Sequence, residues 1–227
     1  MNKILVIVAH ADDEAIGCGG TLLKHRDNGD IIQIIYMTNG VSARSTLTDV
    51  KEQAEIDNRL NSQQQVCQNL TVDKYHNYDF PDNKMDQVPL IDVTQAIEKI
   101  INCFQPNIIY THHGGDLNID HRIVHQAVLT ACRPQPNSSI NCILTFEVNS
   151  STEWSSNSIG DDFTPNYFVD ISNVANEKNH LLTYYQQEMR DFPHSRSIKA
   201  INVLNQWRGN QVGIKRAEAF MLIRMLN

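Results

Sequence analysis

Residues 4–9 form an uninterrupted apolar run, most of it β-branched, and the polar string H-A-D-D-E follows at once. Such a run is typical of a central parallel strand that is buried on both faces of its sheet. The opening of the chain therefore predicts a buried strand that ends directly in a histidine and three acidic residues.

Further apolar runs alternate with segments of helical character. We predict strands over 4–9, 31–37, 108–110 and 143–146, and helices over about 17–28, 49–69, 89–104, 120–132, 174–190 and 196–207. We expect irregular chain over 78–82, a functional loop over 149–166, and a short helix or strand over 217–226. The alternation indicates an α/β, Rossmann-like fold with a mostly parallel sheet flanked by helices. With no repeat or interdomain linker, residues 1–227 are predicted to form a single domain.

The composition limits the function classes. The chain has 26 acidic and 19 basic residues, a formal net charge of −7, which argues against a nucleic-acid-binding domain and a polybasic membrane surface. No stretch approaches the roughly 18 apolar residues of a transmembrane helix. The five cysteines form no C-x-x-C pair, so neither a disulfide framework nor a cysteine zinc site is indicated. We expect a reducing, cytoplasmic setting, no nucleic-acid partner and no membrane span.

In a sheet of this kind, ligands bind outside the carboxyl ends of the strands. His10 follows the first strand and offers an imidazole, and Asp13 can turn back towards the same point. Asp12 lies between them and is a candidate base for a metal-bound water. The competing interpretation is that Asp12 and Asp13 cap the helix that starts near Glu14.

A second polar cluster follows the third strand, and His121 in it is a candidate third metal ligand. The cluster comprises His112, His113, Asp116, Asn118, Asp120, His121 and His125. His112 and His113 point to opposite sides if the strand continues, so at most one faces the site. His121 and His125 have the i, i+4 spacing of H-E-x-x-H zinc helices, but Arg122 replaces the glutamate; His125 is better explained as a packed or surface residue.

The glycine-rich string over 17–20 favours packing over phosphate binding. It contains no G-x-G-x-x-G, and no acidic residue closes the second strand to hold a ribose. Small residues at these positions are expected to let the helix approach the sheet closely.

Two strings of the sequence resemble the motifs of one enzyme family. A-H-A-D-D-E at 9–14, with N-I-D-H-R at 118–122, is similar to the LmbE/PIG-L family of zinc-dependent de-N-acetylases, whose motifs are A-H-P-D-D-E and an H-x-D-H-like string. The resemblance implies an LmbE-like fold and a metal bound by His10, Asp13 and His121. It implies Asp12 as general base and Asp120 as a residue that orients a neighbouring group. The family removes an acetyl group from the 2-amino group of an amino sugar, typically an N-acetylglucosaminyl moiety.

The chain departs from these motifs at two positions. Ala11 replaces the family's proline, and Asn118 stands where many members have a histidine that stabilises the oxyanion or protonates the leaving amine. Asparagine donates a hydrogen bond to an oxyanion but cannot act as an acid. The acid is then His194 or His113 from elsewhere in the chain, or Asp12 serves as both base and acid.

Four residues are candidates for substrate contact. They are Arg44 after the second strand, Asp82, Asn118, and Glu147 after the fourth strand. Arg44 also fits a solvated loop charge, and Asp82 a turn residue. Trp154, in the loop over 149–166, fits either a stacking wall for a sugar or a hydrophobic anchor.

These observations lead to one principal hypothesis and one alternative. The chain is expected to be a metal-dependent hydrolase that removes an N-acetyl group from an amino sugar or its conjugate. Zn2+ is the expected cofactor, although two imidazoles and one carboxylate also suit Fe2+ or Co2+. The alternative is a sugar- or nucleotide-binding Rossmann-like module with a non-catalytic metal site, which would have no need for Asp12. The resemblance also allows a homo-oligomer.

Overall fold

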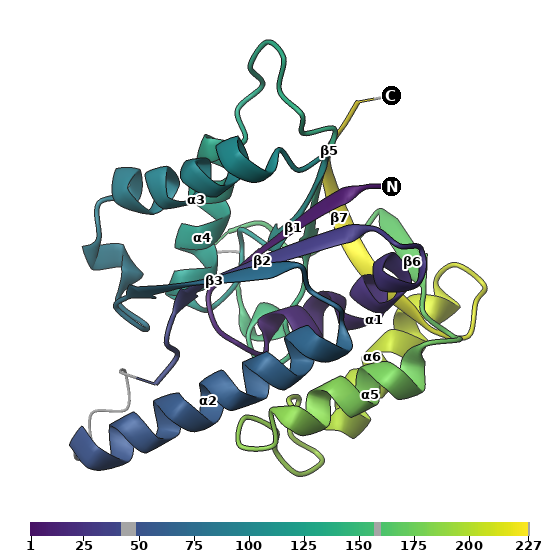
Figure 1. Cartoon of the computed structure of the whole chain (residues 1–227). Coiled ribbons are helices and arrows are strands. Elements are labelled where there is room, and N and C mark those ends of the chain that lie inside the picture. Colours follow the sequence, from purple (N-terminus) through teal and green to yellow (C-terminus); the bar gives the residue numbers. More distant parts are fainter. Residues whose placement is uncertain (42–48, 157–159, 227) are drawn as a thin grey trace.

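The computed structural model describes residues 1–41, 49–156 and 160–226. Within these residues, a seven-stranded sheet has the order β3-β2-β1-β4-β5-β7-β6 (Figure 1). The strands are β1 (Lys3–Val8), β2 (Ile31–Thr38), β3 (Lys74–Phe80), β4 (Ile108–His112), β5 (Cys142–Phe146), β6 (Tyr167–Asp170) and β7 (Ala217–Met225). The first five run parallel, whereas β7 is antiparallel to both β5 and β6. The predicted α/β fold with a mostly parallel sheet is confirmed.

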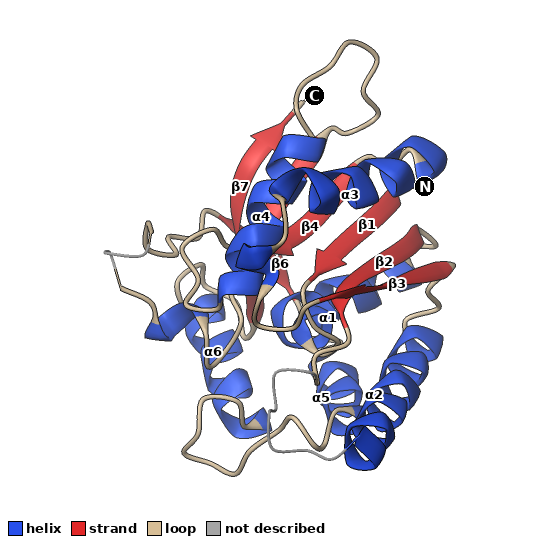
Figure 2. Ribbon diagram, turned by 90° about the vertical axis from the view of Figure 1, so that its left-hand side faces the viewer, coloured by secondary structure: helices blue, strands red, loops and turns tan. Residues whose placement is uncertain are grey.

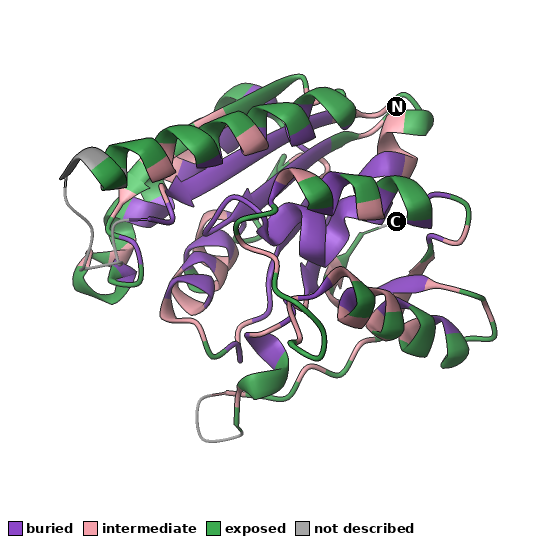
Figure 3. Ribbon diagram, turned by 90° about the horizontal axis from the view of Figure 1, so that it is seen from below, coloured by how far each residue is buried: buried purple, intermediate pink, exposed green. Residues whose placement is uncertain are grey.

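Helices cover both faces of the sheet (Figure 1, Figure 2). One face carries α1 (Asp13–Asp27), α2 (Asp49–Asn69), α5 (Ala175–Tyr184) and α6 (Ile198–Asn210), and the other carries α3 (Leu90–Phe104) and α4 (Ile119–Ala131). Successive residues of β1 point to opposite faces, so Val6 joins one core and Ile7 the other. The buried residues accordingly gather in the strands, while the outer faces of the helices are exposed (Figure 3).

Over the described residues, no helix has both the length and the apolar character of a membrane span. The longest helix, α2, carries many charged and polar side chains along its sequence. In α3, by contrast, Val93, Ile97, Ile100 and Ile101 form one buried face, as helical spacing predicts.

The structure corrects several predicted boundaries. β3 was not expected: residues 78–80 belong to this strand rather than to irregular chain, and its polar residues alternate between exposed and half-buried positions at the sheet edge. The short strand β6 was not expected either. The helix predicted to run to residue 190 ends at Tyr184, and α1 begins at Asp13, earlier than predicted. The segment over 217–226 is resolved as a strand, β7.

The glycines of α1 let the helix lie close to the sheet, as predicted. A Cβ atom at Gly17 would lie 2.2 Å from Phe146 of β5, and one at Gly20 would lie 2.8 Å from Ile171. This close approach holds the first turn of α1 against the carboxyl ends of the strands.

Candidate metal centre

The chain reverses direction between β1 and α1 at Asp12. Asp12 has φ 128° and ψ −27°, a conformation that costs a non-glycine residue on the order of 1–3 kcal/mol. The turn brings Asp13 back to the strand end, where its Oδ2 accepts a hydrogen bond of 2.9 Å from the backbone N–H of His10. Within the described residues, the Asp12 side chain makes no capping bond to α1. The interpretation of Asp12 as a simple helix cap is therefore wrong.

Three buried donor atoms form a nearly equilateral triangle beside this turn. His10 Nδ1 lies 3.3 Å from Asp13 Oδ2, His121 Nε2 lies 3.4 Å from Asp13 Oδ2, and the two histidine nitrogens are 3.3 Å apart. A tetrahedral metal with bonds of about 2.0–2.1 Å separates its ligand atoms by about 3.3–3.4 Å. The three predicted ligands therefore converge with the spacing that a tetrahedral divalent cation requires.

The other nitrogen of His10 is held by carboxylates. His10 Nε2 lies 3.2 Å from Asp120 Oδ2 and 3.2 Å from Asp82 Oδ1. Asp120 is itself fixed, because it accepts hydrogen bonds from the backbone N–H groups of Asn83 and Met85 at 2.6 and 3.1 Å. A carboxylate on the far nitrogen is the usual partner of a metal-ligating histidine, since it sets the tautomer and the ring orientation.

His10, Asp82 and Asp120 also form a cluster of potential ligands, on the far nitrogen of the same imidazole. The triangle with Asp13 and His121 fits a metal better, because both carboxylate oxygens of Asp120 already bind backbone N–H groups. Asp13, in contrast, accepts a backbone hydrogen bond through Oδ2 alone, and its Oδ1 has no hydrogen-bond partner among the described residues.

Asp116 contacts the far nitrogen of His121, as Asp120 contacts that of His10. Asp116 Oδ2 lies 3.2 Å from His121 Nδ1. The same carboxylate accepts hydrogen bonds from the hydroxyls of Ser151 and Thr152 and from the backbone N–H of Asn118. Although burial opposes ionisation, His121 and the two hydroxyls hold the pKa of Asp116 well below its usual range. The sequence placed Asp116 in the second polar cluster but gave it no role.

Buried negative charge surrounds the two ligand histidines. The four carboxylates, all buried, belong to Asp13, Asp82, Asp116 and Asp120. Burial alone would lower the pKa of His121, but Asp13 and Asp116 raise it to about 9. Burial would also lower the pKa of His10, but the carboxylates around its ring raise this pKa well above its ordinary value. This excess of buried negative charge would be offset by a divalent cation in the triangle.

The carboxylate of Asp12 interacts electrostatically with Asp13 and binds two arginines. Its Oδ2 is 3.0 Å from Arg196 Nη1 and its Oδ1 is 3.6 Å from Arg59 Nη2. Burial raises the pKa of Asp12, while both guanidinium groups oppose the rise. Arg59, from α2, also donates to the carbonyl of Ala11 at 3.0 and 3.2 Å and so braces the turn. The sequence predicts no role for either arginine.

Glu14 supports the same turn from the core. Its carboxylate accepts a hydrogen bond of 2.6 Å from the Tyr185 hydroxyl and one of 3.1 Å from the backbone N–H of Asp12. Burial raises the pKa of Glu14 to about 7. Glu14, the third acidic residue of the A-H-A-D-D-E string, therefore supports the turn from within the core.

Only one of the two adjacent histidines at the end of β4 faces the centre, as predicted. His112 Nε2 accepts a hydrogen bond of 2.9 Å from the backbone N–H of Ala9, and its ring stacks on His121 at 3.9 Å. Burial lowers the pKa of His112 well below its ordinary value. His113 instead bonds the carbonyl of Asp161. His125 donates to the carbonyl of His112, in accord with a packed residue.

The remaining predicted site residues lie around the centre. Asn118 caps α4, accepting from the backbone N–H of Asp120 and donating to Asn83 Oδ1 at 3.3 Å. Glu147 binds Arg208 through both oxygens, at 2.7 and 2.6 Å. His194 is exposed and packs edge-on against Trp154. Asp82 is buried beside His10, and Arg44 lies outside the described residues.

Sequence comparison relates the chain to de-N-acetylases. Residues 5–132, more than half of the 227, match the family PIG-L, GlcNAc-PI de-N-acetylase. The diacetylchitobiose deacetylase of Thermococcus kodakarensis is 30% identical over 193 residues, which cover 78% of this chain and 67% of that protein.

Solved structures share the fold at lower identity. The N,N'-diacetylchitobiose deacetylase of Pyrococcus horikoshii has a TM-score of 0.80 at 20% identity, covering 98% of this chain and 84% of that one. A 4-carboxy-2-hydroxymuconate hydratase of Pseudomonas putida has a TM-score of 0.76 at 18% identity, covering 100% and 98%. Because enzymes with such different names share this fold, the assignment rests on the sequence matches. By those matches, the chain belongs to the LmbE/PIG-L family of GlcNAc-PI de-N-acetylases.

Proposed function

We propose that the chain is a metal-dependent hydrolase that removes an N-acetyl group from an amino sugar or an amino-sugar conjugate. The observation that carries the proposal is the triangle of His10, Asp13 and His121. The buried carboxylate of Asp12, which interacts electrostatically with Asp13, supplies the candidate base. Family membership supports the reaction class. The relatives from Thermococcus and Pyrococcus, which are named for diacetylchitobiose, support an N-acetylated sugar as substrate.

Zn2+ is the cofactor that we propose for the triangle, with Fe2+ or Co2+ as alternatives. Two imidazoles and one carboxylate at tetrahedral spacing suit zinc, and three protein ligands leave a coordination position open. Bound there, such a cation supplies Lewis acidity, which polarises an amide carbonyl and lowers the pKa of water.

Asp12 is the proposed general base. Its carboxylate takes a proton from the attacking water, and burial favours this transfer because it raises the pKa of Asp12. Arg196 and Arg59 hold the carboxylate in place from two sides. The Asn118 amide is the proposed donor to the developing oxyanion.

The leaving amine requires a proton, and His194 is the proposed acid. His194 Nδ1 accepts a hydrogen bond from the backbone N–H of Arg196, so its Nε2 carries the proton in the neutral ring. The alternative is that Asp12 returns the proton it has taken. Among the proposed substrate contacts, Arg44, Asn118 and Glu147 remain candidates, whereas Asp82 is better placed to orient His10.

Asp12→Asn tests the proposal. Bound metal and the release of free amine from N-acetylglucosamine, diacetylchitobiose and N-acetylglucosaminides would be measured for the wild type and the variant. We expect the variant to keep its metal and to lose about 10²–10⁴-fold in kcat, because positioned general bases contribute about that much. A wild type that binds metal but releases no amine from any of these compounds would favour the binding-module alternative.

A further inference from the structure

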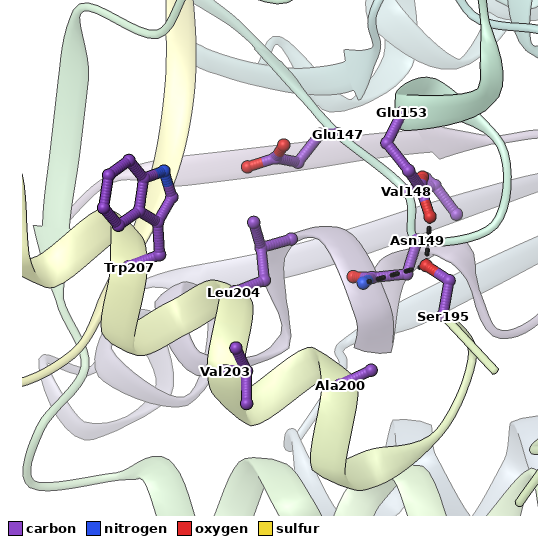
Figure 4. A pocket seen from close by; sticks show the side chains of 9 residues that line it. All are labelled: Glu147, Val148, Asn149, Glu153, Ser195, Ala200, Val203, Leu204 and Trp207. Carbon is purple, nitrogen blue, oxygen red and sulfur yellow. Dashed lines mark hydrogen bonds between the residues drawn. The ribbon is translucent and has the colours of Figure 1, made fainter. Parts of the chain in front are cut away.

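A cavity of about 290 Å³ lies between α6 and the segment that follows β5 (Figure 4). One wall is a stripe of apolar side chains along α6, formed by Ala200, Val203, Leu204 and Trp207. These positions have the i, i+3, i+4, i+7 spacing of a single helix face. Val203 is nevertheless 53% exposed and Trp207 58% exposed, so this face is only partly covered.

The stripe is not the face by which α6 packs on the protein. The buried residues of α6 are Ile201, Asn205 and Gly209, which lie on another side of the helix. The helix thus has its packing face and, in addition, an apolar face that borders a cavity. Because Val203 and Trp207 on this second face stay exposed, the face is a candidate surface for an apolar occupant.

The polar groups of the opposite wall are already paired within the protein. Glu147 is bound by Arg208 through both oxygens. Glu153 accepts a hydrogen bond from the Ser195 hydroxyl, and Asn149 donates to the same hydroxyl at 3.5 Å. A polar ligand would have to compete with these bonds, whereas an apolar one would leave them intact. The cavity therefore favours an apolar occupant.

Hydrogen bonds link one end of the cavity to the candidate metal centre. Arg196 donates to Asp12 Oδ2 at 3.0 Å and to the Ser150 hydroxyl at 2.9 Å. The backbone N–H of Ser150 donates in turn to the hydroxyl of Ser195, which lines the cavity. From Ala200 the cavity follows α6 to Trp207, about 10 Å at roughly 1.5 Å per residue. The Ser195 end of the cavity is thus linked to the proposed base through Arg196, and the Trp207 end leads away from it.

We infer that this cavity binds an alkyl chain carried as the aglycone of the amino sugar whose acetyl group is removed. The inference rests on the proposed function and narrows its substrate class to N-acetylated glycosides with an alkyl aglycone. At about 30 Å³ for each non-hydrogen atom, the volume accommodates a chain of roughly ten atoms.

The first test compares n-octyl and methyl N-acetyl-β-glucosaminide as substrates of the whole chain. We expect wild-type kcat/KM to be at least about tenfold higher for the octyl compound, because each buried CH₂ favours binding. Val203→Asn should bring the ratio close to one. Ile91→Asn is the matched control, since Ile91 is 55% exposed on α3, across the sheet. A wild-type ratio of one, or a ratio unchanged by Val203→Asn, would overturn the inference.

The second test needs no catalysis. The chain has two tryptophans, so Trp154→Phe leaves Trp207 as the single reporter of the cavity. Octyl glucoside below its micellar concentration should shift the Trp207 emission to shorter wavelength, and methyl glucoside should not. If this shift appears but neither acetylated glycoside is hydrolysed, the proposed function fails while alkyl binding stands. If hydrolysis occurs without the shift, the alkyl site fails and the proposed function stands.

A second copy of the chain is the competing occupant of the apolar stripe. Sedimentation of the wild type and Trp207→Ala distinguishes the two cases. A wild-type dimer that the substitution dissociates would overturn the inference in favour of a subunit interface. An oligomeric state that does not change on substitution agrees with a ligand cavity.

Discussion

The two sides of the candidate site are built from different kinds of structure. On the strand side, His10 and Asp13 are buried just after β1, and His121 is buried at the start of α4. Further carboxylates hold the two histidine rings. On the C-terminal side, the chain between β5 and α6 presents exposed rings such as Trp154 and His194. The difference suggests a division of labour: the strand side holds the proposed metal and base, and the C-terminal side contacts the substrate and supplies the proposed acid, His194.

The largest effect is expected from His121→Ala, which removes one corner of the ligand triangle. We expect loss of nearly all bound metal and of activity by at least about 10³-fold, since a site with three protein ligands would retain two. Metal content after dialysis and amine release measure the two losses. His125→Ala is the control one turn further along α4, where the side chain bonds the His112 carbonyl and lies outside the triangle. Equal metal loss in both variants would contradict the ligand assignment.

Asp120→Asn should weaken metal binding about 10–100-fold, the usual cost of removing the carboxylate that orients a metal-ligating histidine. The affinity is measured by competition with a chromophoric chelator. Asp92→Asn, at an exposed position in the first turn of α3, is the matched control. Unchanged affinity in Asp120→Asn would show that Asp82, the other carboxylate at His10 Nε2, is sufficient to orient His10.

Gly17→Ala tests the packing beneath the strand side. Because the new Cβ would lie 2.2 Å from Phe146, we expect the free energy of unfolding to fall by about 1–3 kcal/mol. Gly19→Ala is the control in the same helix: its Cβ would meet no atom closer than 3.6 Å, so the change should be neutral or stabilising. Denaturant unfolding measures both, and equal effects would contradict the role of Gly17.

The smallest effect is expected on the C-terminal side, from Arg196→Ala. Loss of the 3.0 Å bond to Asp12 should lower kcat about tenfold and leave the metal content unchanged. Arg190→Ala is the control in the same segment, since Arg190 Nη1 donates to the backbone carbonyl of Gln187. If Arg196→Ala abolished metal binding, the C-terminal side would be part of the metal centre and the division would fail.

The sequence was sufficient to place the strand side. The polar string that begins at His10 and the polar cluster around His121 each follow a strand, and the carboxyl ends of parallel strands share one edge of a sheet. The same reasoning predicted that only one of His112 and His113 would face the centre. Local pattern and parallel topology together are thus sufficient to predict that the three candidate ligands lie close together.

The C-terminal side was not accessible in the same way. Arg196 is 184 residues from the aspartate it binds, and no motif marks it or Arg59 as a partner. Asp116 was visible in a polar cluster, but its hydroxyl donors come from Ser151 and Thr152, in another segment. Such contacts depend on how irregular segments pack, which spacing along the chain does not encode. β3 was missed for a related reason, since a polar edge strand carries little apolar pattern.

The position of the bound metal tests the central claim most directly. Crystals grown with Zn2+ would be examined by anomalous scattering at the zinc edge. We predict one strong peak about 2.0–2.2 Å from His10 Nδ1, Asp13 Oδ2 and His121 Nε2, with the Asp12 carboxylate outside bonding distance. A peak on the far nitrogen of His10, between Asp82 and Asp120, or a peak bonded to Asp12, would contradict the account.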